Sequence, residues 1–261
     1  MSDILQKELR NQWEQRANHQ GNTCSGVLFK NFPVDFNQYL HEWHAQIILS
    51  QLLPLLPQQA SLLDLGCGYG RMSALIHAAR PDIKIIGLDF AFAYCKLYQS
   101  NLTRNPIICA DVSQLPFQEG RFDAVISITT LMYVPEDRRV AVTKTILQLV
   151  KPRGLVLFID PGLEFSKLVT IFKKSHSLTS GQGFYLSTYE NLGKSSLSRI
   201  IGSGGLFGFT FLLPILYLFR QHRWLRQNLF KLSKWLDKKF SNWRKFSLHR
   251  WMLLEKNDLD N

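Results

Sequence analysis

Between residues 61 and 159, short apolar runs alternate with segments whose apolar positions recur at helical spacing. Runs that are rich in Leu, Ile and Val and nearly free of polar residues are typical of strands buried on both faces of a parallel sheet. We therefore predict an α/β fold, a doubly wound and mostly parallel sheet with helices on both faces. The expected strands are Ser61–Leu65, Ile83–Leu88, Ile107–Cys109, Phe122–Ile128 and Leu155–Ile159, and the expected helices are Arg71–Ala79, Phe92–Asn101 and Glu136–Val150.

The segments on either side of this region predict a different organisation. Two helical patterns precede it and end before Pro54 and Pro57, so we expect an N-terminal helical cap over residues 1–57. The regular core then covers 58–160, and a C-terminal part covers 161–261. In that last part the expected elements are a helix and loop over Pro161–Gly183, a helix over Ser187–Gly202 that ends in glycines, and strands over Gly208–Leu213 and Leu248–Leu254.

Composition narrows the class of protein. The chain has 261 residues, 46% of them hydrophobic and 20% charged, which suits one large α/β domain and excludes a disordered chain. Its four cysteines show no paired spacing and no nearby His ligand pattern, so we expect reduced thiols, no disulfide scaffold and no metal site. The polar, acid-containing N-terminus does not resemble a signal or transit peptide. These features together predict a cytoplasmic protein.

The segment DLGCGYGR after the first expected strand carries the strongest chemical signal. Gly66 and Gly68 allow backbone conformations that a Cβ would block, so a ligand can lie against main-chain amides, and Gly70 permits close packing at the start of the helix. The GxGxG spacing differs from the GxGxxG of dinucleotide sites. Asp64 would repel a pyrophosphate but can hold the ammonium end of an amino-acid-bearing nucleoside. The alternative is a structural turn without a ligand.

Two further acids follow expected strands. Asp89 ends the second strand and can accept hydrogen bonds from both hydroxyls of a ribose. Asp111 ends the third strand, where it can accept from an adenine amino group while the amide of Val112 faces a ring nitrogen. Ile128 and Thr129 end the fourth strand, where a reacting centre would lie. All of these positions meet at the carboxyl edge of a parallel sheet, which is the ligand crevice of open α/β folds.

Together, DLGCGYGR, the acid of IIGLDF, the segment CADVSQLPFQEGRFDAVIS and the LVKPRGLVLF run resemble class I S-adenosylmethionine-dependent methyltransferases, over roughly residues 60–160. The likeness is to the small-molecule type of that family. It implies a seven-stranded sheet whose last strand is antiparallel, for which Leu248–Leu254 is the candidate, and S-adenosyl-L-methionine as cofactor. The expected cofactor-binding residues are Asp64, Gly66, Cys67, Gly68, Gly70, Asp89, Phe90, Asp111, Val112, Ile128 and Thr129.

Two positions bear on catalysis and on closure of the site. Tyr133 stands where the family often has a His, so a His-based proton relay is unavailable there and Tyr133 itself becomes a candidate catalytic residue. The N-terminal QWEQRA resembles the element with which some family members cover the bound cofactor. Trp13 in this element is either such a lid or a helix-packing residue.

The residue that would accept a proton is poorly specified, because methyl transfer depends mainly on positioning of the nucleophile. His41 and His44, three residues apart on one expected helix, are candidate general bases at the mouth of the pocket. The alternative is that they are surface or packing histidines. Neither NPPY nor a Pro-Cys pair follows the fourth strand, so the amino-adenine and carbon-5 cytosine chemistries of the family lose support, and a nucleic-acid acceptor is not expected.

The excess positive charge is concentrated near the C-terminus. Residues 220–250 hold ten basic residues and one acid, which is nine of the net charge of +11. The preceding run Ile200–Phe219 is uncharged and long enough to span a membrane, but its glycines and Pro214 argue against a span. The basic stretch that follows would also stay on the cytoplasmic side, which would place residues 1–199 on the side without cofactor. An insertion at about 214–247 has leucines at helical spacing with basic residues around them, which fits either a helical lid or a segment on an anionic membrane surface.

From these features we expect a methyltransferase that acts on an oxygen or nitrogen of a hydrophobic or lipid-linked small molecule or glycan, peripherally associated with a membrane. The alternatives are a methyltransferase of soluble metabolites or natural products, and a non-catalytic binding protein that retains the fold.

Overall fold

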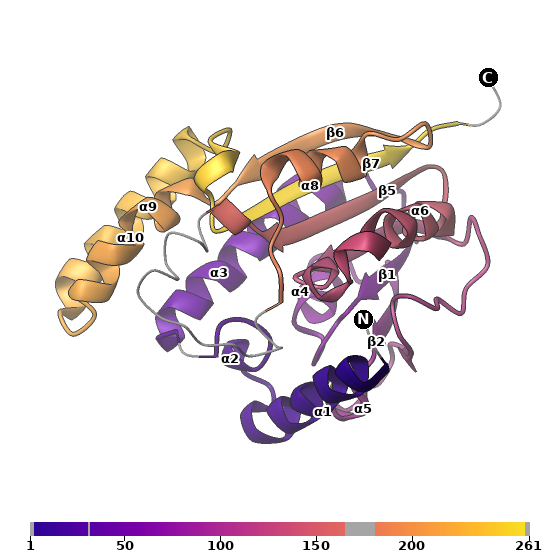
Figure 1. Cartoon of the computed structure of the whole chain (residues 1–261), viewed down its shortest axis with the longest axis horizontal. Helices are drawn as coiled ribbons and strands as arrows, with labels where there is room; N and C mark the ends of the chain where they lie inside the picture. Colours follow the sequence, from indigo (N-terminus) through magenta and orange to yellow (C-terminus); the bar gives the residue numbers. More distant parts are fainter. Residues whose placement is uncertain (1–2, 31, 165–180, 259–261) are drawn as a thin grey trace.

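The structure is a computed structural model, and it describes residues 3–30, 32–164 and 181–258. These residues form a seven-stranded sheet with the order β3-β2-β1-β4-β5-β7-β6, flanked by helices on both faces (Figure 1). Strand β7 runs antiparallel to both of its neighbours, and the other pairings are parallel. The strands are β1 Ser61–Leu65, β2 Lys84–Asp89, β3 Ile107–Cys109, β4 Phe122–Ile128, β5 Val150–Pro161, β6 Ser198–Gly205 and β7 His249–Lys256. The predicted α/β fold and its antiparallel last strand are confirmed.

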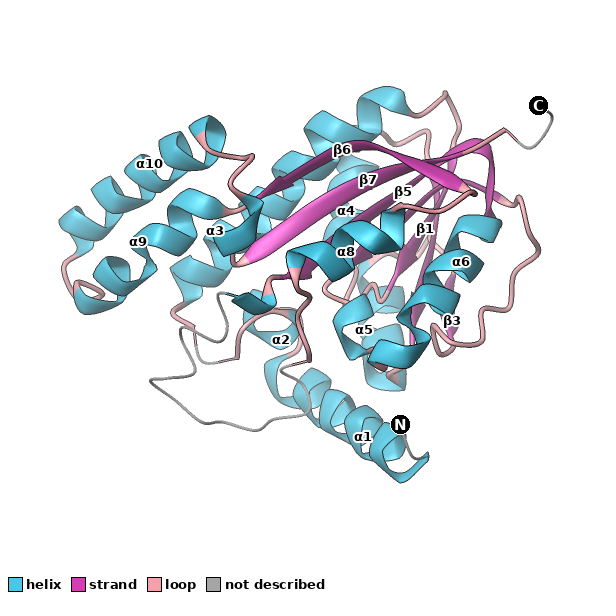
Figure 2. Cartoon of the chain, turned by 45° about the horizontal axis from the view of Figure 1, so that its top comes forward, coloured by secondary structure: helices cyan, strands magenta, loops and turns pink. Residues whose placement is uncertain are grey.

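The helices surround this sheet in two layers and form one projecting hairpin (Figure 2). Helix α3 continues through a π-helical turn at Ile48–Leu52 and a 3₁₀ turn at Leu53–Leu55. The predicted helix Glu136–Val150 is a 3₁₀ turn, Glu136–Arg138, followed by α6. The helices are α1 Asp3–Gln20, α2 Cys24–Val27, α3 Val34–Ile47, α4 Arg71–Ala79, α5 Phe92–Asn101, α6 Arg139–Leu149, α8 Leu186–Gly193, α9 Phe207–Leu218 and α10 Arg223–Lys239, with further 3₁₀ turns at Leu131–Tyr133 and Arg244–Phe246.

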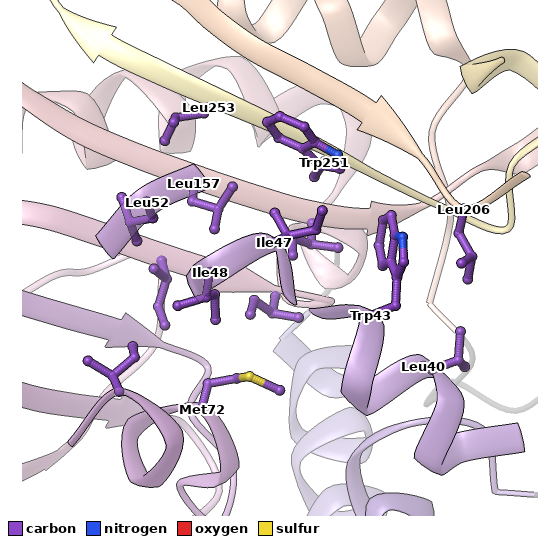
Figure 3. Packing of buried hydrophobic residues seen from close by; sticks show 14 of the residues in the cluster. Leu40, Trp43, Ile47, Ile48, Leu52, Met72, Leu157, Leu206, Trp251 and Leu253 are labelled. Carbon is purple, nitrogen blue, oxygen red and sulfur yellow. The ribbon is translucent and has the colours of Figure 1, made fainter. Parts of the chain in front are cut away.

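Alternate residues of each strand enter different cores, because side chains of a strand point to opposite faces. On one face, Leu157 of β5 and Leu253 of β7 pack with residues of α3, the π-helical turn after it, α4 and α9, among them Leu40 and Ile48 (Figure 3). On the other face, Phe158 of β5 and the residues of the other strands that point the same way pack against α6 and α8. Nearly continuous apolar runs are therefore required in the central strands, which explains why the sequence pattern identifies them.

Two predictions for the C-terminal part are wrong. The helix predicted over Ser187–Gly202 ends at Gly193, and the strand beside β7 is Ser198–Gly205; the strand predicted over Gly208–Leu213 is part of helix α9. The glycines of β6 are required by a distant neighbour, since a Cβ at Gly204 would lie 2.5 Å from the indole nitrogen of Trp251. The helix and loop predicted over Pro161–Gly183 lie mostly outside the described residues.

Helices α9 and α10 form a hairpin that extends past the end of the sheet (Figures 1 and 2). Asp237 of α10 holds it together, because one carboxylate oxygen accepts from the backbone N–H of Gly208 at 2.5 Å and the other accepts from the hydroxyl of Tyr39 at 2.8 Å. The uncharged run 200–219 is divided between β6 and α9. In the described ranges, no helix combines the length and the apolar character that crossing a membrane requires.

Candidate active site

One pocket lies at the carboxyl edge of β1, β2, β3 and β4 and is covered by α1. Its lining includes eleven of the residues that the sequence singled out. They are Trp13, Gly66, Cys67, Gly68, Asp89, Phe90, Asp111, Val112, Ile128, Thr129 and Tyr133. Asp64, Gly70, His41 and His44, which the sequence also singled out, do not line it. The strand-end positions therefore converge, as expected where parallel strands end together.

The glycine turn shapes the floor of the pocket. Gly66 has φ of +72°, and a Cβ there would lie 2.1 Å from Oγ1 of Thr130. Gly68 has φ of +55°, and its Cβ would meet the side chain of Val27 at 2.8 Å. Both positions need glycine for conformation and for space, because the side chains of Thr130 and Val27 pack against the backbone of the turn.

Asp89 is joined to this turn. Its Oδ2 accepts from the backbone N–H of Gly68 at 2.9 Å, and its Oδ1 accepts from the N–H of Ala91 at 3.0 Å. Burial raises the pKa of its carboxyl group to about 6, against these two hydrogen bonds, which lower it. Each oxygen retains acceptor capacity for a ligand, because a carboxylate has about four lone-pair sites.

Asp64 and Gly70 lie behind the turn. The carboxylate of Asp64 is buried and accepts from the hydroxyl of Ser73 at 2.7 Å, and burial raises its pKa to about 6. Gly70 precedes α4 with φ of +89°, and a Cβ there would meet Tyr98 and Leu102 at 2.8 Å. The prediction that Gly70 permits close packing at the start of the helix agrees with these contacts. Asp64 supports the start of α4 through Ser73.

Helix α1 forms the roof. Trp13 is 7% exposed and stands edge-on to Tyr133, with ring centroids 5.4 Å apart, and to Tyr94 at 6.0 Å. The amide of Gln6 donates to Oδ2 of Asp111 at 2.5 Å. Glu14 accepts from the backbone N–H of residues 92 and 93 at the start of α5. Trp13 therefore both packs against aromatic neighbours and lines the pocket, and polar contacts tie α1 to two sides of the site.

The two candidate histidines lie behind a residue that sequence reasoning missed. Arg71 lines the pocket and donates to Nδ1 of His44 at 3.1 Å and to Nδ1 of His41 at 3.4 Å. His44 is fully buried and is also hydrogen-bonded to His249 at 2.8 Å. Burial and the charge of Arg71 lower the pKa of both candidate histidines. The only signal for Arg71 in the sequence is its position directly after the glycine turn.

Tyr133 lines the pocket after the end of β4, and Asp160 of β5 lies outside the lining but acts electrostatically on Tyr133. Burial raises the pKa of the Tyr133 phenol above its ordinary value, so it remains protonated at neutral pH. Asp160 is buried, its Oδ1 accepts from the N–H of Met132 at 3.3 Å, and burial raises its pKa to about 7. The pocket thus carries a neutral phenol, and a buried carboxyl group with a raised pKa lies behind the wall.

Comparisons with known proteins agree with this geometry. The family model of the methyltransferase domain matches residues 62–154. Curated relatives include a malonyl-[acyl-carrier protein] O-methyltransferase of Herminiimonas arsenicoxydans, 35% identical over 33% of this chain and 32% of that protein. Another is the tRNA (carboxymethyluridine(34)-5-O)-methyltransferase of Arabidopsis thaliana, 32% identical over 42% of this chain and 26% of that protein. The matched part of the chain spans about a third of the length of these curated relatives.

Among solved structures, phosphoethanolamine N-methyltransferase 1 of Haemonchus contortus, in complex with phosphoethanolamine and S-adenosylhomocysteine, is similar with a TM-score of 0.66. The match covers 100% of this chain and 51% of that one at 14% identity. At this identity the likeness shows a shared fold.

Proposed function

Because the chain belongs to the class I S-adenosylmethionine-dependent methyltransferases, we propose that the pocket under α1 binds S-adenosyl-L-methionine and that the protein methylates an oxygen or nitrogen nucleophile. One observation carries the proposal. The glycine turn, Asp89 and Asp111 open on a single pocket, and the turn requires glycine at position 66, where a Cβ would clash with Thr130. These groups suit a nucleoside with an amino-acid end.

The residues of the pocket divide the work of binding. Asp89 would accept from the ribose hydroxyls, while Asp111 and the amide of Val112 face the adenine. Ser113 N–H and Gln6 both donate to the carboxylate of Asp111 and hold it in place. Trp13 would exclude water from above. The bound cofactor supplies a methyl group that its sulfonium has already activated.

Catalysis then requires that the acceptor be held in line with that methyl group. Tyr133 lies on the wall of the pocket as a protonated phenol, so it can donate a hydrogen bond and orient the nucleophile. His41 and His44 would act indirectly, because Arg71 stands between them and the pocket. We propose that positioning by Tyr133 contributes more than proton abstraction by either histidine.

The acceptor that we propose is a hydrophobic or lipid-linked small molecule or glycan. Strand β6 runs in the direction of β5, since both are antiparallel to β7, and Gly205 and Asp160 both pair with Arg250. Helix α9 therefore leaves the sheet at the edge where the pocket opens. A substrate delivered along the α9–α10 hairpin would arrive near the cofactor.

The outer face of α10 supports this acceptor class. Its leucines at 225, 229 and 236 are half-buried, whereas Trp224 is 76% exposed and Trp235 54% exposed. Lys231, Lys238 and Lys239 are exposed on the same face. Aromatic residues among lysines are typical of a helix on an anionic membrane surface, where each basic residue contributes about 1 kcal/mol. The inner face packs on the protein, so a role as lid is compatible with this surface.

The curated relatives do not indicate one class of acceptor, because their names include an acyl-carrier-protein-bound acid and a tRNA nucleotide. We propose that the protein acts peripherally on the cytoplasmic side of a membrane. Binding to anionic but not neutral vesicles in co-sedimentation, abolished by high salt, is the expected result. Retention in the supernatant with all lipids would leave α10 as a lid, and binding of RNA instead would redirect the acceptor to nucleic acid.

Calorimetric titration with S-adenosyl-L-methionine and S-adenosylhomocysteine tests the cofactor. Saturable binding is expected, and no heat of binding at millimolar cofactor would overturn the proposal. Binding without any turnover on cell extracts would favour a non-catalytic binding protein.

A further inference from the structure

Arg71 lies between the pocket and a buried chain of histidines. Arg71 lines the pocket, and its guanidinium donates to Nδ1 of both His41 and His44. Behind it, Nε2 of His44 lies 2.8 Å from Nδ1 of His249, and the planes of the two rings are nearly parallel, with an angle of 5° between them. His44 and His249 are 0% and 1% exposed. Arg71 is therefore the end of this chain that a ligand can reach.

The guanidinium of Arg71 can only donate, and this determines the direction of each hydrogen bond among Arg71 and the three histidines. A guanidinium has no acceptor, so Nδ1 of His41 and of His44 must both be unprotonated. In neutral His44 the proton then lies on Nε2, which donates to Nδ1 of His249. The proton of neutral His249 lies on its own Nε2. One arginine thus determines the tautomers of three histidines.

These histidines do not compensate the charge of Arg71. Burial and then the nearby guanidinium lower the pKa of His249 to about 3 and that of His44 well below its ordinary value; the same two causes lower the pKa of His41. All three are neutral at neutral pH. They can hold the guanidinium in place, but they leave it a full positive charge.

Nor does a carboxylate pair with Arg71 in the part of the chain that the structure describes. The charge of Asp64 opposes the lowering of the Arg71 pKa, but the carboxylate of Asp64 accepts from Ser73. Burial lowers the pKa of Arg71, which means that its surroundings disfavour the charged form. An anion that arrives with a ligand would stabilise such a partly buried cation.

We propose that Arg71 binds an anionic group, a carboxylate or a phosphate, of the ligand in the pocket, and that His41, His44 and His249 are its positioning residues. A guanidinium has five N–H donors, of which two are used by the histidines, so others remain for a bidentate contact. Two sources share this chemistry: the carboxylate at the amino-acid end of the cofactor, and an acidic group of the methyl acceptor. Both sources rest on the proposed function.

The first arm of the test identifies a cofactor source. S-adenosylhomocysteine and 5′-methylthioadenosine, which lacks the amino-acid end, are titrated into the wild type, Arg71→Met, Arg71→Lys and Arg104→Met. Arg104 is exposed and outside the pocket, so it controls for loss of one positive charge. If the carboxylate of the cofactor contacts Arg71, Arg71→Met weakens S-adenosylhomocysteine at least tenfold and leaves methylthioadenosine unchanged, and Arg71→Lys recovers part of the loss.

The second arm identifies an acceptor source. Malonate and inorganic phosphate are titrated into the same proteins after saturation with S-adenosylhomocysteine. If the acceptor provides the anion, these probes bind at millimolar concentration to the wild type and to Arg104→Met but not to Arg71→Met, while S-adenosylhomocysteine binds all of them alike. Should the wild type bind no S-adenosylhomocysteine, the proposed function fails, and titration of the free protein with the two anions still tests Arg71.

The histidines are tested by rescue. His44→Gln retains a side-chain acceptor for Arg71, whereas His44→Phe does not, and thermal melting reports whether either variant folds. We expect His44→Phe to weaken the same ligand, S-adenosylhomocysteine or the anions, that Arg71→Met weakens. We expect His44→Gln to retain most of the affinity for that ligand. The proposal is overturned if folded Arg71→Met binds S-adenosylhomocysteine and both anions as the wild type does.

Discussion

The backbone N–H of Gly68 donates to Oδ2 of Asp89 at 2.9 Å, across 21 positions of the chain. This hydrogen bond joins the glycine turn after β1 to the acid that ends β2. The glycine turn and the carboxylate that we propose to bind the ribose are therefore joined, so a substitution at either position should change cofactor affinity.

Asp89→Ala should weaken S-adenosyl-L-methionine binding at least tenfold. The carboxylate is expected to accept from two ribose hydroxyls, and each charge-assisted hydrogen bond contributes about 1.5–3 kcal/mol. Asp111→Ala should weaken binding less than Asp89→Ala does, because the carboxylate of Asp111 already accepts hydrogen bonds from Gln6 and Ser113. Calorimetry on folded variants checks both expectations. Wild-type affinity in Asp89→Ala would contradict the proposal that Asp89, at the end of β2, binds the ribose.

Cofactor affinity should rise as the pH increases through about 6. Burial raises the pKa of Asp89 to that value, so below it the group is a neutral acid that offers fewer acceptors to the ribose. Titrations between pH 5 and about 7.5 should therefore show tighter binding at the upper end. Asp89→Asn, which cannot ionise, should bind weakly with a flatter profile. An equally steep profile in that variant would assign the titration to another group.

Gly66→Ala should destabilise the fold far more than Gly120→Ala. Both glycines have positive φ, +72° and +65°, so an alanine is strained by about 1–2 kcal/mol at either site. At Gly120 nothing lies within 4 Å of the added Cβ, whereas at Gly66 it would meet Thr130 at 2.1 Å. Urea denaturation of both variants measures the difference. Equal losses of unfolding free energy would mean that the turn adjusts to the methyl group.

Asp237→Ala should lower the unfolding free energy by about 2–4 kcal/mol, since it leaves buried donors of Tyr39, Gly208 and Phe209 without their acceptor. Lys238→Ala is the matched control, because this neighbouring side chain is exposed and should change stability by no more than about 0.5 kcal/mol. Thermal melting compares the two. Similar melting temperatures would show that the hairpin is held by apolar packing alone.

Replacing both Trp224 and Trp235 with serine should reduce binding to anionic vesicles at least tenfold without lowering cofactor affinity. The two indoles are exposed on the outer face of α10, so their removal leaves the packed inner face unchanged. Phe92→Ser with Val140→Ser removes two exposed apolar side chains from α5 and α6 and serves as control. Equal vesicle binding by both double variants would contradict a docking role for this face.

The sequence alone determined the elements whose signal is local. The strands Ser61–Leu65, Ile107–Cys109 and Phe122–Ile128 and the helices Arg71–Ala79 and Phe92–Asn101 have the predicted bounds. A central strand is apolar because it is buried on both faces, and a glycine turn is visible because glycine adopts positive φ without the steric cost that other residues meet. The acids at the strand ends were identified by the same means, since the order of strand, turn and helix places them at one edge.

Tertiary structure decided what depends on distant partners. Residues 198–205 form a strand because β7 provides their hydrogen-bonding partner and Trp251 covers their glycines, and neither is visible in the local pattern. Helix α9 begins at Phe207 where Asp237, far along the chain, accepts its first N–H groups. The placement of Arg71 before His44 and His249 joins three separate segments. Such contacts form only when the chain has folded, because the side chains that make them are up to 205 positions apart.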